Sequence, residues 1–198
     1  MAANTYLTPE ERTLLESVRV GIAGAGGLGS NCAMHLVRSG VKHITIADFD
    51  VVNESNLNRQ FFFRDQIGQK KVEAIKANLL RIEPDADIRA VDMRLDASSA
   101  REVFADCGIV VEAFDAVDAK VMLVSAFASS GKKLVTASGL AGWGRSNAMR
   151  VRKMGNIVAI GDGETSVGDG AAPVSPRVGI AAAMEANAVV SLLLGCEP

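Results

Sequence analysis

The sequence predicts an α/β fold in which a mostly parallel sheet carries helices on both faces. An apolar run over residues 18–23 leads directly into the glycine turn 24–29, and an apolar helical pattern follows it. Short apolar runs then alternate with helical patterns as far as residue 138. The chain is 48% hydrophobic but only 5% aromatic, which is typical of strands buried on both faces. These observations indicate a Rossmann-like, doubly wound sheet.

Composition excludes several classes of protein. The length of 198 residues suits one domain spanning 1–198, with no internal repeat. A net charge of −2 gives no sign of a nucleic-acid partner. The start of the chain lacks the basic and apolar stretches of a signal peptide, and cysteines are sparse, so we expect a cytoplasmic protein. Glu185 and Asn187 interrupt the longest apolar helix, 178–194, which argues against a membrane span.

The N-terminal segment 1–17 carries a helix start. Thr8 is the expected N-cap, Pro9 takes the first helical position, and Glu11 completes a capping box. We expect a helix over residues 9–17 that leads into the first strand.

The glycine turn predicts nucleotide binding. Gly24 permits a tight turn, Gly26 lets a phosphate approach the backbone, and Gly29 lets the next helix pack close to the strand. The helix start adds unpaired N–H groups and a partial positive charge of about half a unit. NAD, FAD, S-adenosylmethionine and ATP all fit this pattern.

An aspartate ends the second predicted strand, 42–49. Asp48 lies 24 residues after Gly24, and an acid at about that spacing suits the hydroxyl groups of a nucleotide ribose. A turn or helix-capping aspartate is the alternative interpretation.

The chain then departs from an ordinary dehydrogenase, which usually enters a helix soon after this acid. Residues 48–63 are instead polar, and the expected helix is delayed to 65–83. Lys70 and Lys71 fall in its first turn, where a cation opposes the helix dipole. Either these lysines are solvated, or an anion lies close to them.

The rest of the chain continues the alternation. The expected elements are a strand at 86–95, a helix at 98–105, strands at 108–113 and 132–138 around a helix at 116–130, an antiparallel pair at 146–152 and 156–160, a flexible loop at 161–177 and a helix at 178–194.

Asp115 follows a central strand at the edge where ligands of such sheets bind, although it is also placed to cap the next helix. The last helix is apolar on most of its circumference, so it is buried within the domain or against a second copy.

Together, these residues resemble the adenylating enzymes for ubiquitin-like proteins, the ThiF/MoeB/HesA family. The resemblance covers residues 18–138 most strongly. The matching motifs are Gly24-Ala25-Gly26-Gly27-Leu28-Gly29, Asp48-Phe49-Asp50, Ser55-Asn56-Leu57-Asn58-Arg59-Gln60, Gly68-Gln69-Lys70-Lys71-Val72, Arg81-Ile82-Glu83-Pro84 and Asp115. The short length is most like a small ThiF, the adenylyltransferase of the sulfur carrier ThiS.

The resemblance implies that ATP and the C-terminal Gly-Gly carboxylate of a carrier give an acyl-adenylate and diphosphate. It assigns the ribose to Asp48, the phosphates to Asn56, Arg59 and Lys71, and Mg²⁺ to Asp115. The implied nucleotide-binding set is Gly24, Gly26, Gly27, Leu28, Gly29, Asp48, Asp50, Asn56, Arg59, Gln60, Lys71 and Asp115. The implied catalytic set is Arg59, Lys71, Asp115 and Arg12, the last acting across a homodimer interface.

The sequence also departs from its relatives. It has no CxxC pairs, so we expect no zinc. Loop 161–177 has no cysteine, and Cys32 and Cys107 are expected to pack as small apolar residues. Where relatives often carry an arginine shortly after the aspartate, this chain has Lys120, which keeps the charge without the planar fork.

Other functions stay open. The chain could instead be a molybdopterin-pathway relative, or a tRNA-modification relative that activates another carboxylate. An NAD-dependent oxidoreductase is less favoured because of residues 53–60 and Lys71, and because His35 and His43 lie away from the expected site.

Overall fold

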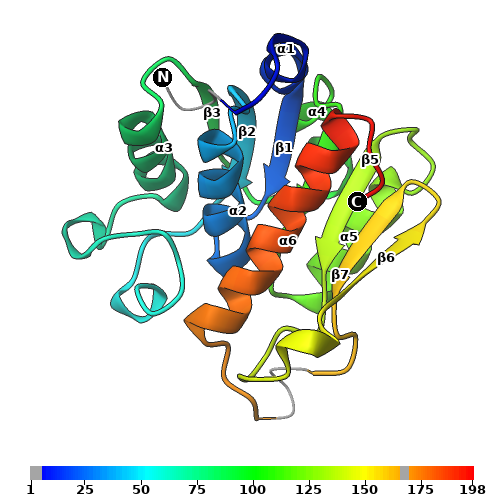
Figure 1. Ribbon diagram of the computed structural model, residues 1–198. Coiled ribbons are helices and arrows are strands. Elements are labelled where there is room, and N and C mark those ends of the chain that lie inside the picture. Colours follow the sequence, from blue (N-terminus) through cyan, green and yellow to red (C-terminus); the bar gives the residue numbers. More distant parts are fainter. Residues whose placement is uncertain (1–5, 166–169) are drawn as a thin grey trace.

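The computed structural model describes residues 6–165 and 170–198, and it contains one seven-stranded sheet in the order β3-β2-β1-β4-β5-β7-β6 (Figure 1). The strands are β1 (Arg19–Ala23), β2 (His43–Asp48), β3 (Asp87–Asp92), β4 (Ile109–Glu112), β5 (Lys133–Ala137), β6 (Arg150–Met154) and β7 (Ile157–Gly161). Neighbouring strands are parallel except for β6, which pairs antiparallel with β7. The predicted mostly parallel sheet with a small antiparallel extension is confirmed.

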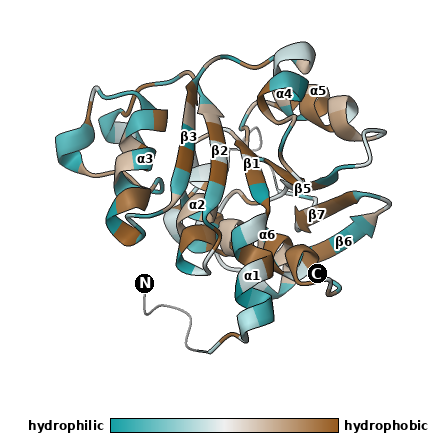
Figure 2. Ribbon diagram, turned by 90° about the horizontal axis from the view of Figure 1, so that it is seen from above, coloured by the Kyte–Doolittle hydropathy of each residue, from teal (hydrophilic) through white to brown (hydrophobic). Residues whose placement is uncertain are grey.

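Helices cover both faces of this sheet (Figure 2). They are α1 (Pro9–Ser17), α2 (Gly27–Arg38), α3 (Lys71–Ile82), α4 (Ala97–Val103), α5 (Val117–Phe127) and α6 (Ser175–Leu193). One core cluster joins α2, α3 and α6 to the sheet, and a second joins α4 and α5 to its other face. Among the described residues, no helix combines the length and apolar character needed to cross a bilayer.

Strand order reverses between β1 and β4, which places a crevice at the carboxyl ends of these two strands. Gly24 lies in this crevice with φ +104°, a conformation that favours glycine. A Cβ atom at Gly29 would lie 1.8 Å from the carbonyl oxygen of Gly24, so α2 packs this closely only because residue 29 is glycine. The structural roles expected of Gly24 and Gly29 are confirmed, whereas the phosphate role of Gly26 stays a prediction.

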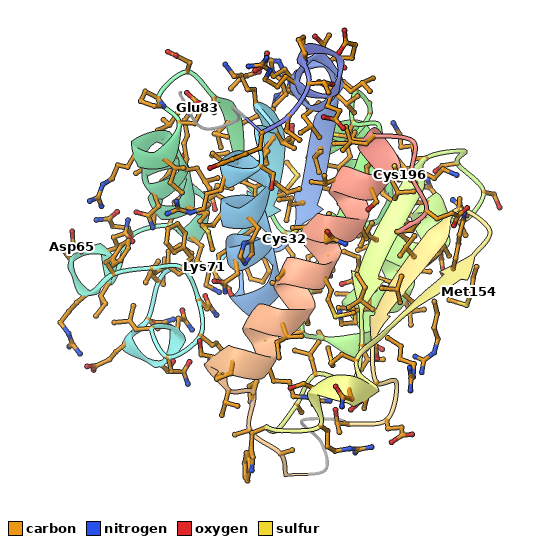
Figure 3. The ribbon with its side chains drawn as sticks, in the orientation of Figure 1. Cys32, Asp65, Lys71, Glu83, Met154 and Cys196 are labelled. Atoms are coloured by element: carbon orange, nitrogen blue, oxygen red, sulfur yellow. The ribbon has the colours of Figure 1, made fainter. Side chains whose placement is uncertain are left out.

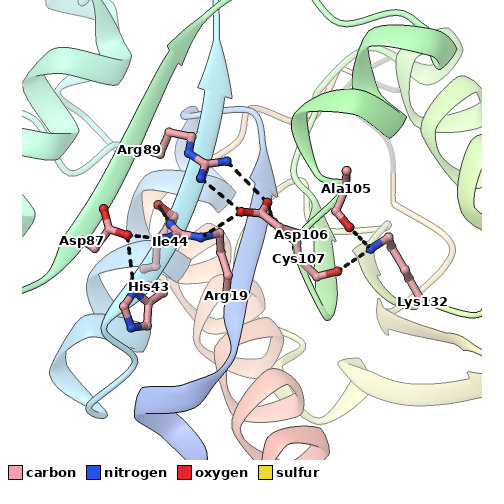
Figure 4. A network of polar contacts seen from close by, with 9 residues as sticks. All are labelled: Arg19, His43, Ile44, Asp87, Arg89, Ala105, Asp106, Cys107 and Lys132. Atoms are coloured by element: carbon pink, nitrogen blue, oxygen red, sulfur yellow. Dashed lines mark hydrogen bonds and ion pairs between the residues drawn. The ribbon is translucent and has the colours of Figure 1, made fainter.

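At the opposite, amino end of the sheet, an ion-pair network ties strands together (Figure 4). The Arg19 guanidinium on β1 contacts the carboxylates of Asp87 and Asp106, and His43 lies 3.4 Å from Asp87. Arg89 on β3 also reaches Asp106, at 3.1 Å. The network joins β1, β2, β3 and the turn before β4, so it stabilises the scaffold far from the crevice.

Local signals predicted some boundaries better than others. The helix expected at 9–17 is α1, and its Thr8–Glu11 capping box is present. The helix expected at 65–83 begins only at Lys71, because Gly68 adopts a left-handed φ of +88° after a short 3₁₀ turn at Arg64–Gln66. The antiparallel pair starts later than expected, since Ser146–Ala148 is also a 3₁₀ turn.

The last helix begins three residues before the expected position. Helix α6 starts at Ser175, because Pro176 is well tolerated in a first helical turn. Part of the predicted flexible loop 161–177 lies outside the described residues, so its mobility stays a prediction.

Candidate functional site

The glycine turn is fastened to the end of β2 by one carboxylate. Asp48 Oδ2 accepts a hydrogen bond of 2.7 Å from the Ala25 amide, and Oδ1 accepts one of 2.8 Å from the Asp50 amide. Asp48 is therefore a turn aspartate, the alternative weighed above. A carboxylate has about four lone-pair positions, so it retains acceptor capacity for a ribose hydroxyl.

Space remains beside the first residues of α2. Gly26 is the N-cap of α2 and offers no side-chain acceptor to the amides of the first turn. A Cβ atom at Gly26 would meet only the Gln60 side-chain nitrogen, at 3.9 Å. The helix start can therefore be approached closely by an anion.

The polar segment after β2 wraps against α2. The Asn31 side chain donates to the Arg59 carbonyl oxygen at 2.9 Å, and the Phe61 amide donates to Ser30 Oγ at 3.0 Å. A Cβ atom at Gly27 would lie 3.5 Å from Arg59 Cγ. The segment thus brings the side chains of Arg59 and Gln60 to the glycine turn.

The polar groups of this segment are only partly satisfied. Arg59 donates from Nη1 to Ser55 and Asn58, and Asn56 accepts from the Asn53 amide at 3.0 Å. Gln60 is buried, and its Oε1 has no hydrogen-bond partner among the described residues. Asn56 is occupied in shaping the turn, while the rest of the Arg59 fork remains available for a ligand.

Lys71 is the first residue of α3 and points inward (Figure 3). Its side chain is 7% exposed, and its ammonium lies 2.8 Å from Asp50 Oδ2. The neighbouring Lys70 contacts Asp92. Carboxylates of the chain itself therefore offset the unfavourable helix dipole at both lysines, and a bound phosphate beside Lys71 stays a prediction.

Asp115 lies in the loop after β4, across the crevice from β2. It is exposed and makes no hydrogen bond or ion pair with any described residue. The N-cap of α5 is Ala116, without a side-chain cap, so the interpretation of Asp115 as a helix cap is wrong. The Ala113 amide bonds the Ala23 carbonyl oxygen at 2.9 Å, which holds this loop beside the glycine turn.

Arg12 is not brought to this crevice. It is exposed on α1, which precedes β1 and lies at the amino end of the sheet (Figure 1). Within one chain the glycine turn and Arg12 are therefore at opposite ends of β1. A role for Arg12 requires a second copy of the chain and stays a prediction.

Sequence reasoning missed a buried pair behind Asp115. Glu112 is completely buried, and its carboxylate accepts from Thr136 at 2.6 Å and from Lys120 at 3.0 Å. Lys120 also donates to the Ala137 carbonyl oxygen. An ammonium group has only three donors, so Lys120 is fully used inside the protein and does not supply a free charge to the crevice.

A second missed pair closes the other side of the crevice. Arg177, in the first turn of α6, contacts Asp162 after β7 and donates to the Gly144 carbonyl oxygen at 2.6 Å. Both charged side chains are buried. Burial opposes the Asp162 charge, but hydrogen bonds from Thr165 and Glu164 hold the pKa of Asp162 below its usual range. A cation at a helix start was the available signal, as for Lys71.

The cysteines offer no activated thiol in the crevice. Cys32 and Cys107 are buried as predicted, and desolvation raises the pKa of Cys32 well above its ordinary value and that of Cys107 to about 11. Cys196 is exposed near the C-terminal end. Within residues 6–165 and 170–198, no three His, Cys, Asp or Glu side chains are grouped to hold a metal ion.

The chain is similar in sequence to several known proteins. The family model described as ThiF matches residues 3–198. The chain is 37% identical over 116 residues to the SAMP-activating enzyme E1 of Haloferax volcanii, covering 58% of this chain and 43% of that protein. It is 31% identical over 189 residues to the adenylyltransferase and sulfurtransferase UBA4 of Yarrowia lipolytica, covering 91% and 47%. The chain thus spans less than half the length of these curated relatives.

Solved structures support the fold. The tRNA N6-threonylcarbamoyladenosine dehydratase TcdA of E. coli, in complex with AMP, superposes with a TM-score of 0.84. The alignment covers 94% of this chain and 90% of that chain at 20% identity. At 20% identity, this similarity shows a shared fold and nothing further.

Proposed function

Because the chain belongs to the ThiF family, we propose that it is an ATP-dependent adenylyltransferase. Its substrate is the C-terminal Gly-Gly carboxylate of a ubiquitin-like sulfur carrier of the ThiS type, in thiamine biosynthesis. The products are the acyl-adenylate and diphosphate. One observation carries the proposal: the glycine turn, Asp48, Arg59 and the Lys71–Asp50 pair meet at the carboxyl ends of β1 and β2, with Asp115 in the neighbouring loop after β4.

The binding roles follow from this geometry. Asp48, already fixed by two amides, accepts from the ribose hydroxyls. The start of α2 at Gly26, Gly27 and Leu28 offers amides to the phosphates. Arg59 presents a planar fork to phosphate oxygens, whereas Lys71 presents a point charge oriented by Asp50. Asn56 and Gln60 complete the polar wall.

The chemistry requires charge neutralisation more than a nucleophile. An anionic carrier carboxylate attacks the α-phosphorus, the bond from that phosphorus to the β-phosphate bridge oxygen breaks, and diphosphate leaves. Fixed cations at Arg59 and Lys71 reduce repulsion in the attack and stabilise the departing charge. Positioning the two substrates supplies the rest, so no activated cysteine is needed.

Asp115 suits a magnesium ion. It is an exposed carboxylate without a competing partner among the described residues, and Mg²⁺ prefers one or two carboxylates with phosphate and water oxygens. A bound Mg²⁺ would neutralise phosphate charge. Asp115 is the residue of this chain that would hold it, and we propose that zinc is not required.

We also propose a homodimer in which Arg12 completes the partner's site. Helix α6 supports this, since its outward side carries half-buried apolar residues such as Ile180 and Met184. A dimer would cover this surface, and its geometry would have to bring α1 of one copy to the crevice of the other.

ATP–diphosphate exchange with a purified ThiS-type carrier tests the proposal. Exchange should depend on the carrier and disappear when its terminal Gly-Gly is removed. Exchange with a molybdopterin-type carrier alone would move the protein to that pathway. Adenylate formation on a tRNA-linked or small carboxylic acid, without exchange on any carrier, would favour the tRNA-modification alternative. Hydride transfer to NAD without exchange would overturn adenylation.

A further inference from the structure

Edge strand β6 presents an uncovered, basic surface. All five of its residues, Arg150–Met154, are exposed. In the register with β7, Arg152 lies opposite Ala159 and Met154 opposite Ile157. Ile157 packs with the core cluster of α5, whereas Val158 and Ile160 belong to the cluster of α6. Arg150, Arg152 and Met154 therefore lie on the α5 side of the sheet, and we call this surface the β6 platform.

No described helix covers this platform. Helix α5 lies over the middle of the sheet, and β6 extends beyond it at the sheet edge (Figure 2). Met154 marks this outer edge and is 56% exposed (Figure 3). The platform is therefore an accessible face with two guanidinium groups and one apolar side chain, Met154, at the end of the strand.

The two arginines carry charge that the described part of the chain does not neutralise. Arg150 forms no ion pair there, and Arg152 donates only to the main-chain oxygen of Asp162, at 3.2 Å. By contrast, Lys153 on the opposite face of the same strand is paired with Glu197 at 2.7 Å. The uncompensated charge is thus confined to the α5 side, and it selects an acidic occupant. A second copy paired through β6 would bring like charges together, which is unfavourable.

Arg150 lies at the crevice end of β6, because it pairs with Gly161 at the carboxyl end of β7. The strand order puts β6 four strands from β1, which is about 19 Å at the usual strand spacing. An extended tail of about six residues spans that distance. A partner seated on the platform could thus place its C-terminal carboxylate at the glycine turn.

From these observations we infer that the β6 platform docks an acidic face of the carrier protein whose carboxylate is adenylated. The inference rests on the proposed function and names the surface that selects its protein substrate. Arg150 and Arg152 provide the charge complementarity, and Met154 provides the apolar contact. The carrier tail then runs along the carboxyl ends of β7, β5 and β4.

The test compares Arg150→Glu with Lys153→Glu, which makes the same charge change on the opposite face of β6. The probe is a ThiS-type carrier ending in Gly-Gly. Its Kd is measured by calorimetry without ATP, and its KM by ATP–diphosphate exchange. Arg150→Glu should raise both values about tenfold with kcat and the KM for ATP unchanged. Lys153→Glu should change them less than about twofold, and Arg150→Lys should restore binding.

The outcomes separate the two proposals. If wild type supports exchange but Arg150→Glu matches Lys153→Glu, docking on the platform is overturned while adenylation stands. If wild type binds the carrier through Arg150 without exchange, adenylation fails and the platform stands. Absence of both binding and exchange overturns both. A change of oligomeric state in Arg150→Glu would make the face an interface between copies and would also overturn carrier docking.

Discussion

The ammonium group of Lys71 lies 2.8 Å from the half-exposed carboxylate of Asp50, although the lysine side chain itself is almost completely buried. The Lys71 amide also bonds the Asp50 carbonyl oxygen at 2.9 Å. Two separate segments, one after β2 and one opening α3, are thereby held together. The Asp50 carboxylate offsets the cost of burying the lysine charge, at a position where a phosphate could also contact the ammonium group.

Removing Asp50 should mainly reduce stability, whereas removing Lys71 should mainly reduce activity. Asp50→Ala leaves a buried cation without its partner, and we expect a loss of about 1–2 kcal/mol in the free energy of unfolding, reduced by the exposure of Asp50. Lys71→Met removes the buried charge itself, so stability should change less, while kcat/KM for ATP falls about a hundredfold. Urea unfolding and exchange assays measure the two quantities. Equal stability losses would contradict this assignment.

Arg59→Lys keeps the charge beside Gly27 but loses the planar fork. We expect a loss of about tenfold or more in kcat/KM for ATP, because phosphate oxygens are no longer held at two points. Arg64→Lys is a matched control on the same segment, since Arg64 is exposed and its one ion pair within the described residues is with Glu54. Steady-state exchange kinetics compare the variants. Similar activities for both would remove Arg59 from phosphate binding.

Asp115→Ala should abolish Mg²⁺-dependent adenylate formation, with a loss of about a hundredfold or more. Because Asp115 makes no hydrogen bond or ion pair with described residues, the fold should be unaffected. Asp118→Ala, in the first turn of α5, is the matched control. The assay is adenylate formation against Mg²⁺ concentration, with circular dichroism to verify folding. Near-wild-type activity in Asp115→Ala would exclude it from the mechanism.

Glu185 on α6 should make stability depend on pH in an unusual direction. Its side chain is completely buried, and neither carboxylate oxygen has a partner among the described residues. Desolvation raises the pKa of Glu185 well above its ordinary value, although Lys120 on α5 opposes the shift and Glu112 on β4 adds to it. Cys32 on α2 faces the same carboxyl. The folded state therefore binds a proton that the unfolded state has released.

The direction of this pH dependence follows from the linkage between proton binding and folding. Stability from the protonated carboxyl is complete below its unfolded pKa and is lost as pH rises toward the folded pKa. Glu185→Gln cannot titrate, so it should match wild type near pH 4.5 and exceed it by more than about 1 kcal/mol at pH 8. The difference between the two proteins, measured in urea at each pH, cancels carboxylates common to both. A difference that is constant with pH would contradict the prediction.

Local chemistry made several elements predictable. The Thr8–Glu11 capping box and the glycine turn each encode their conformation within a few residues, so α1 and the β1–α2 connection followed from the sequence. The start of α3 did not, because the left-handed Gly68 breaks a helical pattern that hydrophobic spacing alone extends.

Ion pairs between residues that are distant in sequence could not be predicted from local sequence patterns. The Arg177–Asp162 and Lys120–Glu112 pairs depend on where β7, α6, β4 and α5 meet, and nothing local specifies those meetings. From the sequence we expect Lys120 to keep a positive charge at the crevice. In the structure, however, the Lys120 ammonium group donates all three of its hydrogen bonds to groups inside the protein. Burial and competition among donors are properties of the folded chain.

The terminal hairpin has a wider consequence. Strands β6 and β7 are joined by a tight turn and meet the parallel sheet only through β5, while the glycine turn and Lys71 belong to its other half. Changes of charge along β6 can therefore accumulate without disturbing nucleotide chemistry. Such a layout allows copies of one ancestral gene to diverge in the proteins they recognise while inheriting the same reaction intact.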